Sequence, residues 1–567
     1  MHNKAKGWGD PLVLAPVLMI VALTGPLIAG LAGVLLPAFG FFPTLGGKHF
    51  TLSFLHEVTH KPGFWYSVQL SIWIGVATTF LSLVIVISFF AAQWGSPTFQ
   101  RLSRFISPLM SVPHAAAAFG FAFLIAPSGW IVRLFSPWAT GFNHPPDWLV
   151  INDPAGNALL IGLVLKEIPF IFLVALSASS QINVDERLKV ARSLGYGRVW
   201  SWFIAVFPTL YKQLRLPIYA VIAFSSSVVD VALILGPNFP AMLPVQLLRW
   251  MNDPELEMRF VAAAGAVWQL GATLLALISW RIGEALVGYI GRRLTISGER
   301  QKNDHWFRAL ATLMMAIVIV TFVLSMIILA VWSCAGFWRF PNALPSGFTF
   351  SRWLENAGSV WTPVVNAMSI AITSTMICVA LTLACLENEF RRDIQFTPAA
   401  LRILYLPLIV PQIAFLFGIS VFLVRYGLDG SFWPVTLAHT IFVLPYVFLS
   451  LAAPFRNFDL RYLQVASSLG VSQNKVLFSV RLPMLLKPIL LAIALGIAIS
   501  IAQYLPTLLI GAGRLPTITT EAVALAAGGD RRLIGIYALV QTLLPAIGFI
   551  AASLVPRAAF PDRKFFR

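Results

Sequence analysis

Long uninterrupted apolar stretches constrain this chain more than any other feature. Residues 68–90 and 310–331, for example, form runs without a charged side chain, and an α-helix needs about 20 such residues to cross the hydrocarbon core of a bilayer. Of the 567 residues, 58% are hydrophobic and only 11% are charged, far less charge than the surface of a soluble protein carries. The sequence therefore predicts an all-α integral membrane protein that lies in contact with the lipid bilayer.

Hydropathy predicts about twelve membrane-spanning helices, six in each half of the chain. The first apolar stretch is too long for the core of a signal peptide and is expected to remain in the mature protein. A polar segment, 291–307, separates a first unit at 1–290 from a second unit at 308–567. The expected spans are 12–38, 67–92, 106–126, 157–180, 216–236, 260–290, 308–333, 364–387, 400–424, 434–454, 487–511 and 534–556.

The net charge of +17 could indicate a nucleic-acid partner. The basic residues, however, lie mainly in short loops between apolar runs, which is the pattern of the positive-inside rule. We therefore expect no nucleic-acid partner, and we expect the N- and C-termini and the loops near 181–215 and 455–486 on the cytoplasmic side. The three cysteines lack the spacing of a metal site, and no metal is expected.

The two halves repeat one another. Ser71, Pro113 and Gly120 precede matching residues by 298 positions, and later matches fall at a common offset of 275. Each predicted unit has six helices, so both units share one orientation and are related by an axis along the membrane normal. Such repeats leave a pathway between the halves. The matched pairs are Ser71 and Ser369, Pro113 and Pro411, Gly120 and Gly418, Gly195 and Gly470, Pro208 and Pro483, and Gly236 and Gly511.

The two longest cytoplasmic loops carry the same pattern, Leu-x-Val-Ala-x-Ser-Leu-Gly, then twelve residues and a proline. The apolar spacing predicts a short helix that ends at a left-handed glycine, followed by a second short helix that stops at the proline. Such a loop can pack against its own bundle or dock on a partner. Repetition at matched sites favours a partner with two equivalent faces. The residues are Leu188, Ala191, Ser193, Leu194, Gly195 and Pro208 in the first copy and Leu463, Ala466, Ser468, Leu469, Gly470 and Pro483 in the second.

This pattern resembles the EAA loop of the permeases of binding-protein-dependent ABC importers. The family's Glu is replaced by Lys189 and Gln464, while its Ala, Gly and Pro are kept in both copies. The fused two-unit form is similar to the ferric-iron and thiamine importer permeases. The resemblance implies a bacterial inner-membrane permease of the type I importer class, two copies of a separate ATPase docked on the loops, and a periplasmic substrate-binding protein.

The chain itself carries no phosphate-binding loop of the GxxxxGK[ST] type. We therefore expect that it is not an enzyme and holds no cofactor, and that ATP and Mg²⁺ bind in the partner ATPase. The resemblance also implies that the helix after each loop lines the pathway. The candidates on these helices are Ser225, Ser226, Asp230, Gln503 and Tyr504.

Lys166 and Glu167 fall within the fourth predicted span. Intramembrane charge is costly and suggests function. Either these side chains bond to neighbouring helices near Pro169, or they contact substrate, and the sequence leaves both possibilities open.

Two other functions compete with the permease interpretation. His56-Glu57-Val58-Thr59-His60 is a literal HExxH zinc-protease motif, and Leu428-Asp429-Gly430 resembles the third-ligand motif of intramembrane metalloproteases. Both motifs lie in predicted outer loops, and Lys61-Pro62-Gly63 would break a helix. A secondary transporter with parallel repeats needs more intramembrane acids and gives no reason for the loop pair. No motif identifies the substrate.

Overall fold

The computed structural model describes residues 11–559 except 299, 301–302 and 395–396. Within these residues the secondary structure is helical, apart from two isolated β-bridges. The prediction of an all-α membrane protein is confirmed. Residues 299 and 301–302 of the expected linker lie outside the described residues, and around them α13 ends at Ile296 and α14 begins at His305.

In the described part of the chain, nine helical segments are long and apolar enough to cross a membrane, and two bent pairs raise the number to eleven. The segments are α1 (Leu14–Ala38), α3 (Phe64–Gln93), α5 (His114–Ile125) with α6 (Trp130–Phe135), α7 (Asn157–Ser180), α13 (Met258–Ile296), α14 (His305–Cys334), α16 (Ala357–Arg392), α19 (Phe432–Arg456) and α26 (Arg531–Ala559). The bent pairs are α17 (Pro398–Ile409) with α18 (Gln412–Arg425), and α21 (Gln473–Val476), η3 (Leu477–Arg481) and α22 (Leu482–Met484) with α23 (Leu486–Ala502).

The remaining expected span, the fifth, contains α10 (Phe207–Ser227) and α11 (Asp230–Leu235). Lys212 and Arg215 lie near the start of α10 and lower its mean hydropathy. α10 is therefore not counted among the helices that are apolar enough to cross a membrane.

Four of the predicted spans are interrupted, although their sequences predicted continuous helices. The third span breaks between α4 (Pro97–Leu109) and α5, and the ninth bends by 81° between α17 and α18. Pro113 and Pro411 lie at these breaks, where a proline cannot donate an amide hydrogen bond and disfavours helix at the residue before it. The fifth span breaks at 228–229 and the eleventh at 503–504, before α24 (Leu505–Gly511). Both pairs of breaks fall at the offsets of the repeat.

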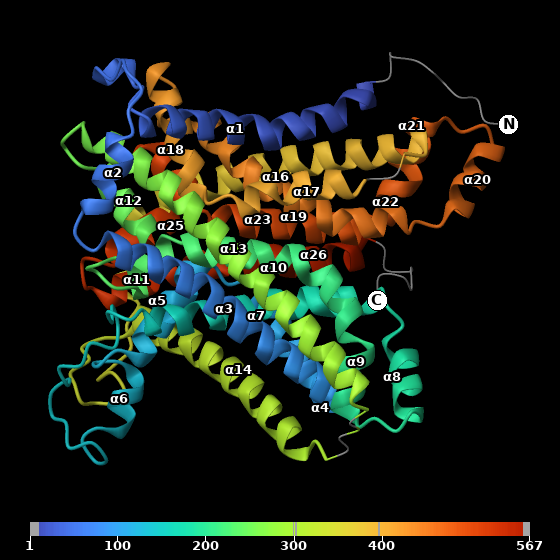
Figure 1. The fold of residues 1–567 in the computed structure, drawn as a ribbon, viewed down its shortest axis with the longest axis horizontal. Coiled ribbons are helices and arrows are strands. Elements are labelled where there is room, and N and C mark those ends of the chain that lie inside the picture. Colours follow the sequence, from blue (N-terminus) through green and yellow to red (C-terminus); the bar gives the residue numbers. More distant parts are fainter. Residues whose placement is uncertain (1–10, 299, 301–302, 395–396, 560–567) are drawn as a thin grey trace.

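Each half exchanges its first helix with the other half. α1 packs along α18, and α14 packs along α5 (Figure 1). Small residues allow these crossings: a Cβ built on Gly33 would lie 2.8 Å from the carbonyl oxygen of Gly418, and one built on Gly120 would lie 2.5 Å from that of Ser325. Small residues permit close helix approach in membranes. The two halves therefore form one interlocked bundle.

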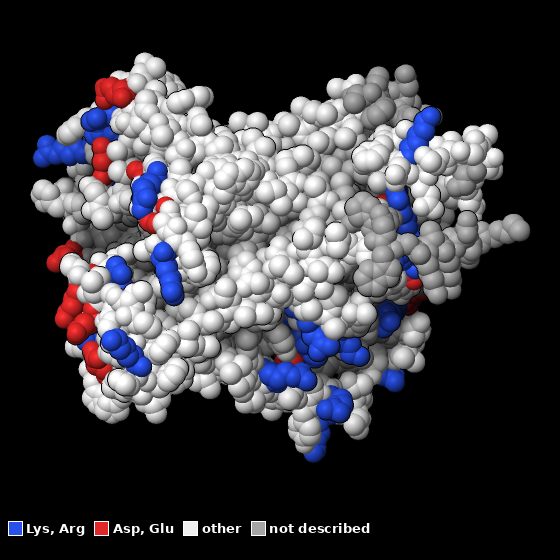
Figure 2. All heavy atoms as spheres, turned by 90° about the horizontal axis from the view of Figure 1, so that it is seen from above, with Lys and Arg blue, Asp and Glu red and all other residues white. Residues whose placement is uncertain are grey.

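The short helices lie at the two ends of the bundle. α8 (Val184–Ser193), α9 (Arg198–Ala205) and α20 (Leu460–Ser468) lie at one end, where α1 also begins (Figure 1). The opposite end carries α2 (Ser53–His60), α6, α11 and α12 (Leu243–Met251). On the face shown in Figure 2, charged residues gather toward these ends, and a band across the middle carries almost none. The remaining short elements are η1 (Pro11–Val13), η2 (Pro43–Leu45), α15 (Ser351–Glu355) and α25 (Ile518–Leu525).

Candidate substrate pathway and coupling surface

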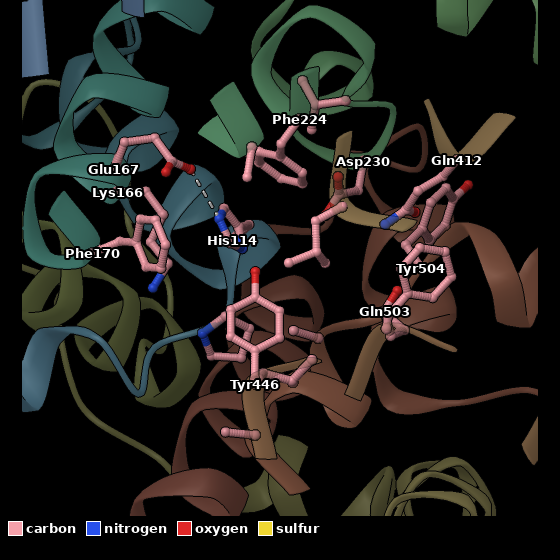
Figure 3. Close-up of a pocket in the computed structure, with 18 of the residues that line it drawn as sticks. His114, Lys166, Glu167, Phe170, Phe224, Asp230, Gln412, Tyr446, Gln503 and Tyr504 are labelled. Carbon is pink, nitrogen blue, oxygen red and sulfur yellow. Dashed lines mark hydrogen bonds and ion pairs between the residues drawn. The ribbon is translucent and has the colours of Figure 1, made fainter. Parts of the chain in front are cut away.

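A cavity of about 190 Å³ lies between the two halves (Figure 3). The interrupted helices form much of its wall: the breaks at 110–113, 228–229 and 503–504 and the residues around 410 all contribute to the lining. α7 and α19 close two further sides. The cavity therefore lies where the two repeats meet, which is where a pathway between parallel repeats is expected.

The two repeats supply different chemistry at matched positions of the cavity. In the repeat alignment, Phe170 corresponds to Tyr446 and Asp230 corresponds to Leu505. All the charged side chains of the lining come from the first half. The polar lining residues are Ser111, His114, Lys166, Glu167, Ser227 and Asp230 from the first half and Gln412, Tyr446, Gln503 and Tyr504 from the second.

Lys166 and Glu167 bond to neighbouring elements and also line the cavity. The Lys166 ammonium donates to the carbonyl oxygen of Met110 at 3.1 Å. Glu167 Oε1 lies 3.3 Å from His114 Nε2, on the first turn of α5. Both bonds reach the interrupted segment around Pro113, so the intramembrane charges hold this break in place.

Asp230 is the first residue of α11, and its buried side chain points into the cavity (Figure 3). Among the described residues it forms no ion pair. Gln412 and Tyr504 lie on the same side of the cavity.

Three of the five predicted pathway residues, Asp230, Gln503 and Tyr504, line the cavity. Ser225 and Ser226 do not: both are fully buried in the helix packing, and Ser226 Oγ donates to the Ala223 carbonyl oxygen at 3.0 Å. Successive helical residues point about 100° apart, so only some members of a serine run can face one cavity. The residue of this run that does so is Ser227, which the sequence analysis left out.

His114, Gln412 and Tyr446 also line the cavity, although none of them was predicted from the sequence. His114 and Gln412 directly follow the two matched prolines. A polar residue directly after the matched proline of each repeat was the signal that could have identified His114 and Gln412.

The predicted helix–glycine–helix geometry is present in the first loop. α8 is followed by Gly195 at φ +89°, and α9 begins at Arg198. In the second loop α20 is followed by Gly470 at φ +73°. The prediction that the second short helix stops at Pro208 is wrong. That helix, α9, ends at Ala205, and Pro208 lies in the first turn of α10. Proline fits that position because the backbone N–H groups in the first turn of a helix have no acceptor within the helix, so the N–H that proline lacks costs no hydrogen bond. Pro483 similarly lies at the start of α22, after the π-helical turn η3.

The candidate coupling helices α8 and α20 bury one side and expose an apolar pair on the other. Leu188 and Ala191 are buried under α8, and in α20 Ala466 is buried and Leu463 is half-buried. Ser193, Ser468 and Gly470 are exposed. The exposed apolar side chains are Val190 (63% exposed), Leu194 (56%), Val465 (60%) and Leu469 (76%), at matched positions of the two repeats.

Polar contacts tie the first candidate coupling loop to the spans. Arg198 Nη2 donates to the carbonyl oxygen of Trp94 at 2.8 Å, just after α3, and Trp94 Nε1 donates to Asp185 Oδ1 at 3.1 Å. The Val199 amide donates to Asp304 Oδ2 at 3.0 Å, beside α14. Burial lowers the pKa of Arg198, and the positive charge of Arg308 adds to this effect. In the second loop, Arg481 Nη1 pairs with Glu387 Oε2 of α16 at 3.1 Å.

The HExxH segment forms α2, which ends at His60. Glu57 pairs with Lys61 at 2.9 Å, and Asp429 is paired with Arg514. Over the described residues, no group of three or more His, Cys, Asp or Glu side chains is arranged to hold a metal ion.

Comparison with known proteins supplies the family. No protein-family model matches the chain. The inner membrane ABC transporter permease protein YnjC of Escherichia coli K12 is 30% identical over 84% of this chain and 85% of its own length. The thiamine transport system permease protein ThiP of Salmonella typhimurium is 25% identical over 78% of the chain and 79% of its own length, and the putative 2-aminoethylphosphonate transport system permease protein PhnV of that organism is 25% identical over 42% of the chain and 90% of its own length. The chain therefore belongs to the ABC transporter permeases, and its fold is that of a multi-pass membrane protein with two tandem permease repeats.

Proposed function

We propose that this chain is the transmembrane subunit of an ATP-driven importer, and that α8 and α20 each dock into one of two copies of a separate ATPase subunit. A periplasmic binding protein would deliver the substrate to the cavity between the halves. ATP and Mg²⁺ would bind in the ATPase, so the chain itself contributes no catalytic group. Both termini and the coupling helices would then lie in the cytoplasm, in agreement with the positive charge of the loops.

The observation that carries this proposal is the exposed apolar pair on each coupling helix. Val190 and Leu194, and their counterparts Val465 and Leu469, leave apolar area uncovered on short helices at one end of the bundle. Residues four apart lie on one face of a helix. An apolar pair on a short helix suits a groove in a partner. Because the pair recurs at both matched positions, the partner should offer two equivalent grooves.

The contacts of the loops indicate how docking could act on the pathway. The first loop is bonded to the end of α3 and to the residues before α14. The second loop is bonded to α16 through Arg481 and to α19 through the carbonyl oxygen of Phe455 at 3.0 Å. α19 also carries Phe442 and Tyr446 on the cavity wall. Movement of the docked helices would therefore reach the cavity through helices that line it or pack on them, and alternate its access.

Replacing Leu194 and Leu469 together by Asp should abolish capture of the ATPase, because a charge at each exposed site would have to be desolvated in an apolar groove. The measurement is the amount of ATPase that co-purifies with the tagged chain after gentle extraction from its native membrane. We expect two ATPase copies per chain for the unchanged protein, and at least a tenfold loss for the double variant. Both side chains are exposed, so folding should be unaffected.

The matched control is Leu344→Asp, since Leu344 is an exposed leucine at the opposite end of the bundle. Equal ATPase capture by the unchanged chain and the double variant would refute docking through these helices. A folded chain with no ATPase under several extraction conditions would instead favour the secondary-transporter alternative.

A further inference from the structure

A buried carboxylate without an ion-pair partner faces the cavity. Asp230 lies at the start of α11, and its side chain is only 8% exposed. The two basic side chains on the described lining are engaged elsewhere: Lys166 donates to the Met110 carbonyl oxygen, and His114 is bonded to Glu167. Figure 3 shows Lys166 on the far side of the cavity from Asp230.

The charged groups of the lining are two carboxylates, Glu167 and Asp230, and one lysine, Lys166, while His114 is bonded to Glu167. A buried charge is costly unless it is paired. A ligand that brings a positive charge to Asp230 would supply the missing pair, whereas an anion placed there would meet a second like charge.

Aromatic rings surround the same site. Phe224 and Tyr504 flank Asp230, and Tyr446 projects its ring toward the middle of the cavity (Figure 3). The face of an aromatic ring attracts a cation, most strongly where water is excluded. Aromatic faces together with one carboxylate form the usual environment of an ammonium or quaternary ammonium group.

We propose that this cavity binds a small organic cation, with its positively charged nitrogen beside Asp230 and between the rings of Phe224 and Tyr504. The cavity volume of about 190 Å³ is below the roughly 300–1,000 Å³ of pockets for drug-sized ligands, so the ligand is small. The inference rests on the proposed function, which makes this cavity part of the transport pathway.

The test compares two probes of one shape. Choline is a small quaternary ammonium ion, and dimethylbutanol is its neutral carbon isostere. Binding of each to the purified full-length chain in lipid nanodiscs would be measured by calorimetry and by the shift of the unfolding temperature. We expect choline to bind about tenfold or more tightly than dimethylbutanol, and Asp230→Asn to remove this preference. Asp429→Asn is the matched control, because it deletes the same charge in an outer loop away from the cavity lining.

The comparison of the two probes on the unchanged chain does not depend on any variant folding. Equal binding of choline and dimethylbutanol, or tighter binding of the zwitterion betaine than of choline, would overturn the assignment. So would an Asp230→Asn chain that keeps the full preference. ATPase capture is measured on the same preparation: a chain that captures the ATPase but shows no cation preference refutes this inference alone, and one that binds choline but captures no ATPase refutes the proposed function alone.

Discussion

Gly418→Leu is expected to destabilise the bundle severely, with a loss of roughly 3 kcal/mol or more in the free energy of unfolding. Gly418 lies where α18 crosses α1, and a Cβ built on it would collide with the carbonyl oxygen of Gly30 and approach the backbone of Gly33 to 2.9 Å. These neighbours are backbone atoms, which cannot move aside as a side chain can. The exchanged helix α1 would have to separate from the second half. The measurement is unfolding of the purified chain in detergent by denaturant or heat.

Gly25→Leu is the control for this prediction. Gly25 belongs to the same helix α1, but the nearest atom to a Cβ built there is Val21 Cγ1, at 3.8 Å in ordinary contact. This variant should unfold close to the unchanged chain. Gly120 is the repeat counterpart of Gly418 and packs against Ser325 of α14, so Gly120→Leu should resemble Gly418→Leu. The interpretation of the crossings is wrong if Gly25→Leu is as destabilising as Gly418→Leu.

The features that the sequence predicted depend on local pattern. Apolar runs give the spans, because each run alone satisfies the length requirement of a bilayer. The glycines of the candidate coupling loops were predictable for a similar reason: a short apolar stripe followed by Gly favours a left-handed helix end, and Gly195 adopts φ +89°.

The features that were missed depend on direction and tertiary contact. Hydropathy does not reveal that the fifth span breaks at 228–229, because the break consists of two valines and contains neither proline nor glycine. The rotation of α10 decides which members of the serine run face the cavity, and Ser225 and Ser226 therefore could not be told from Ser227 in advance. The exchange of α1 and α14 between the halves also leaves no local pattern, since it depends on close approach between a glycine and the backbone of a helix far away in the chain.

The repeats also differ in how each candidate coupling loop is joined to its bundle. In the second half, Arg481 and Glu387 form a buried ion pair, with side chains 3% and 5% exposed. At the corresponding positions of the first half stand Val206 and Phe89, which are fully buried in an apolar cluster. The second half therefore joins this loop to its bundle by a buried ion pair, and the first half does so by apolar packing at the same positions.

Glu387→Phe should lower the free energy of unfolding by about 3–5 kcal/mol, because it leaves the buried Arg481 guanidinium without its carboxylate partner. Arg481→Val should lower it by less, because Glu387 keeps its ion pair with Arg391 at 2.7 Å. The Arg481 guanidinium also lies 3.7 Å from the ring centroid of Phe455 and 4.2 Å from that of Phe390, so its surroundings cannot easily admit water. The double variant Glu387→Phe with Arg481→Val, which copies the first half, should recover most of this loss, since apolar residues often replace a buried pair at little cost. The measurement is denaturant unfolding of all four chains as a double-mutant cycle.

Asp459→Asn provides the matched control within the same loop. Asp459 pairs with Arg461 at 2.6 Å, but the Arg461 side chain is largely exposed, and exposed ion pairs contribute little to stability. This variant should therefore unfold almost as the unchanged chain does. A double variant whose loss equals the sum of the two single losses would show that the pair is not coupled in this way. If instead the double variant is stable but no longer couples ATP hydrolysis to transport, the ion pair serves the movement of the second loop rather than the stability of the bundle. The first loop would then be connected to its bundle by apolar packing alone.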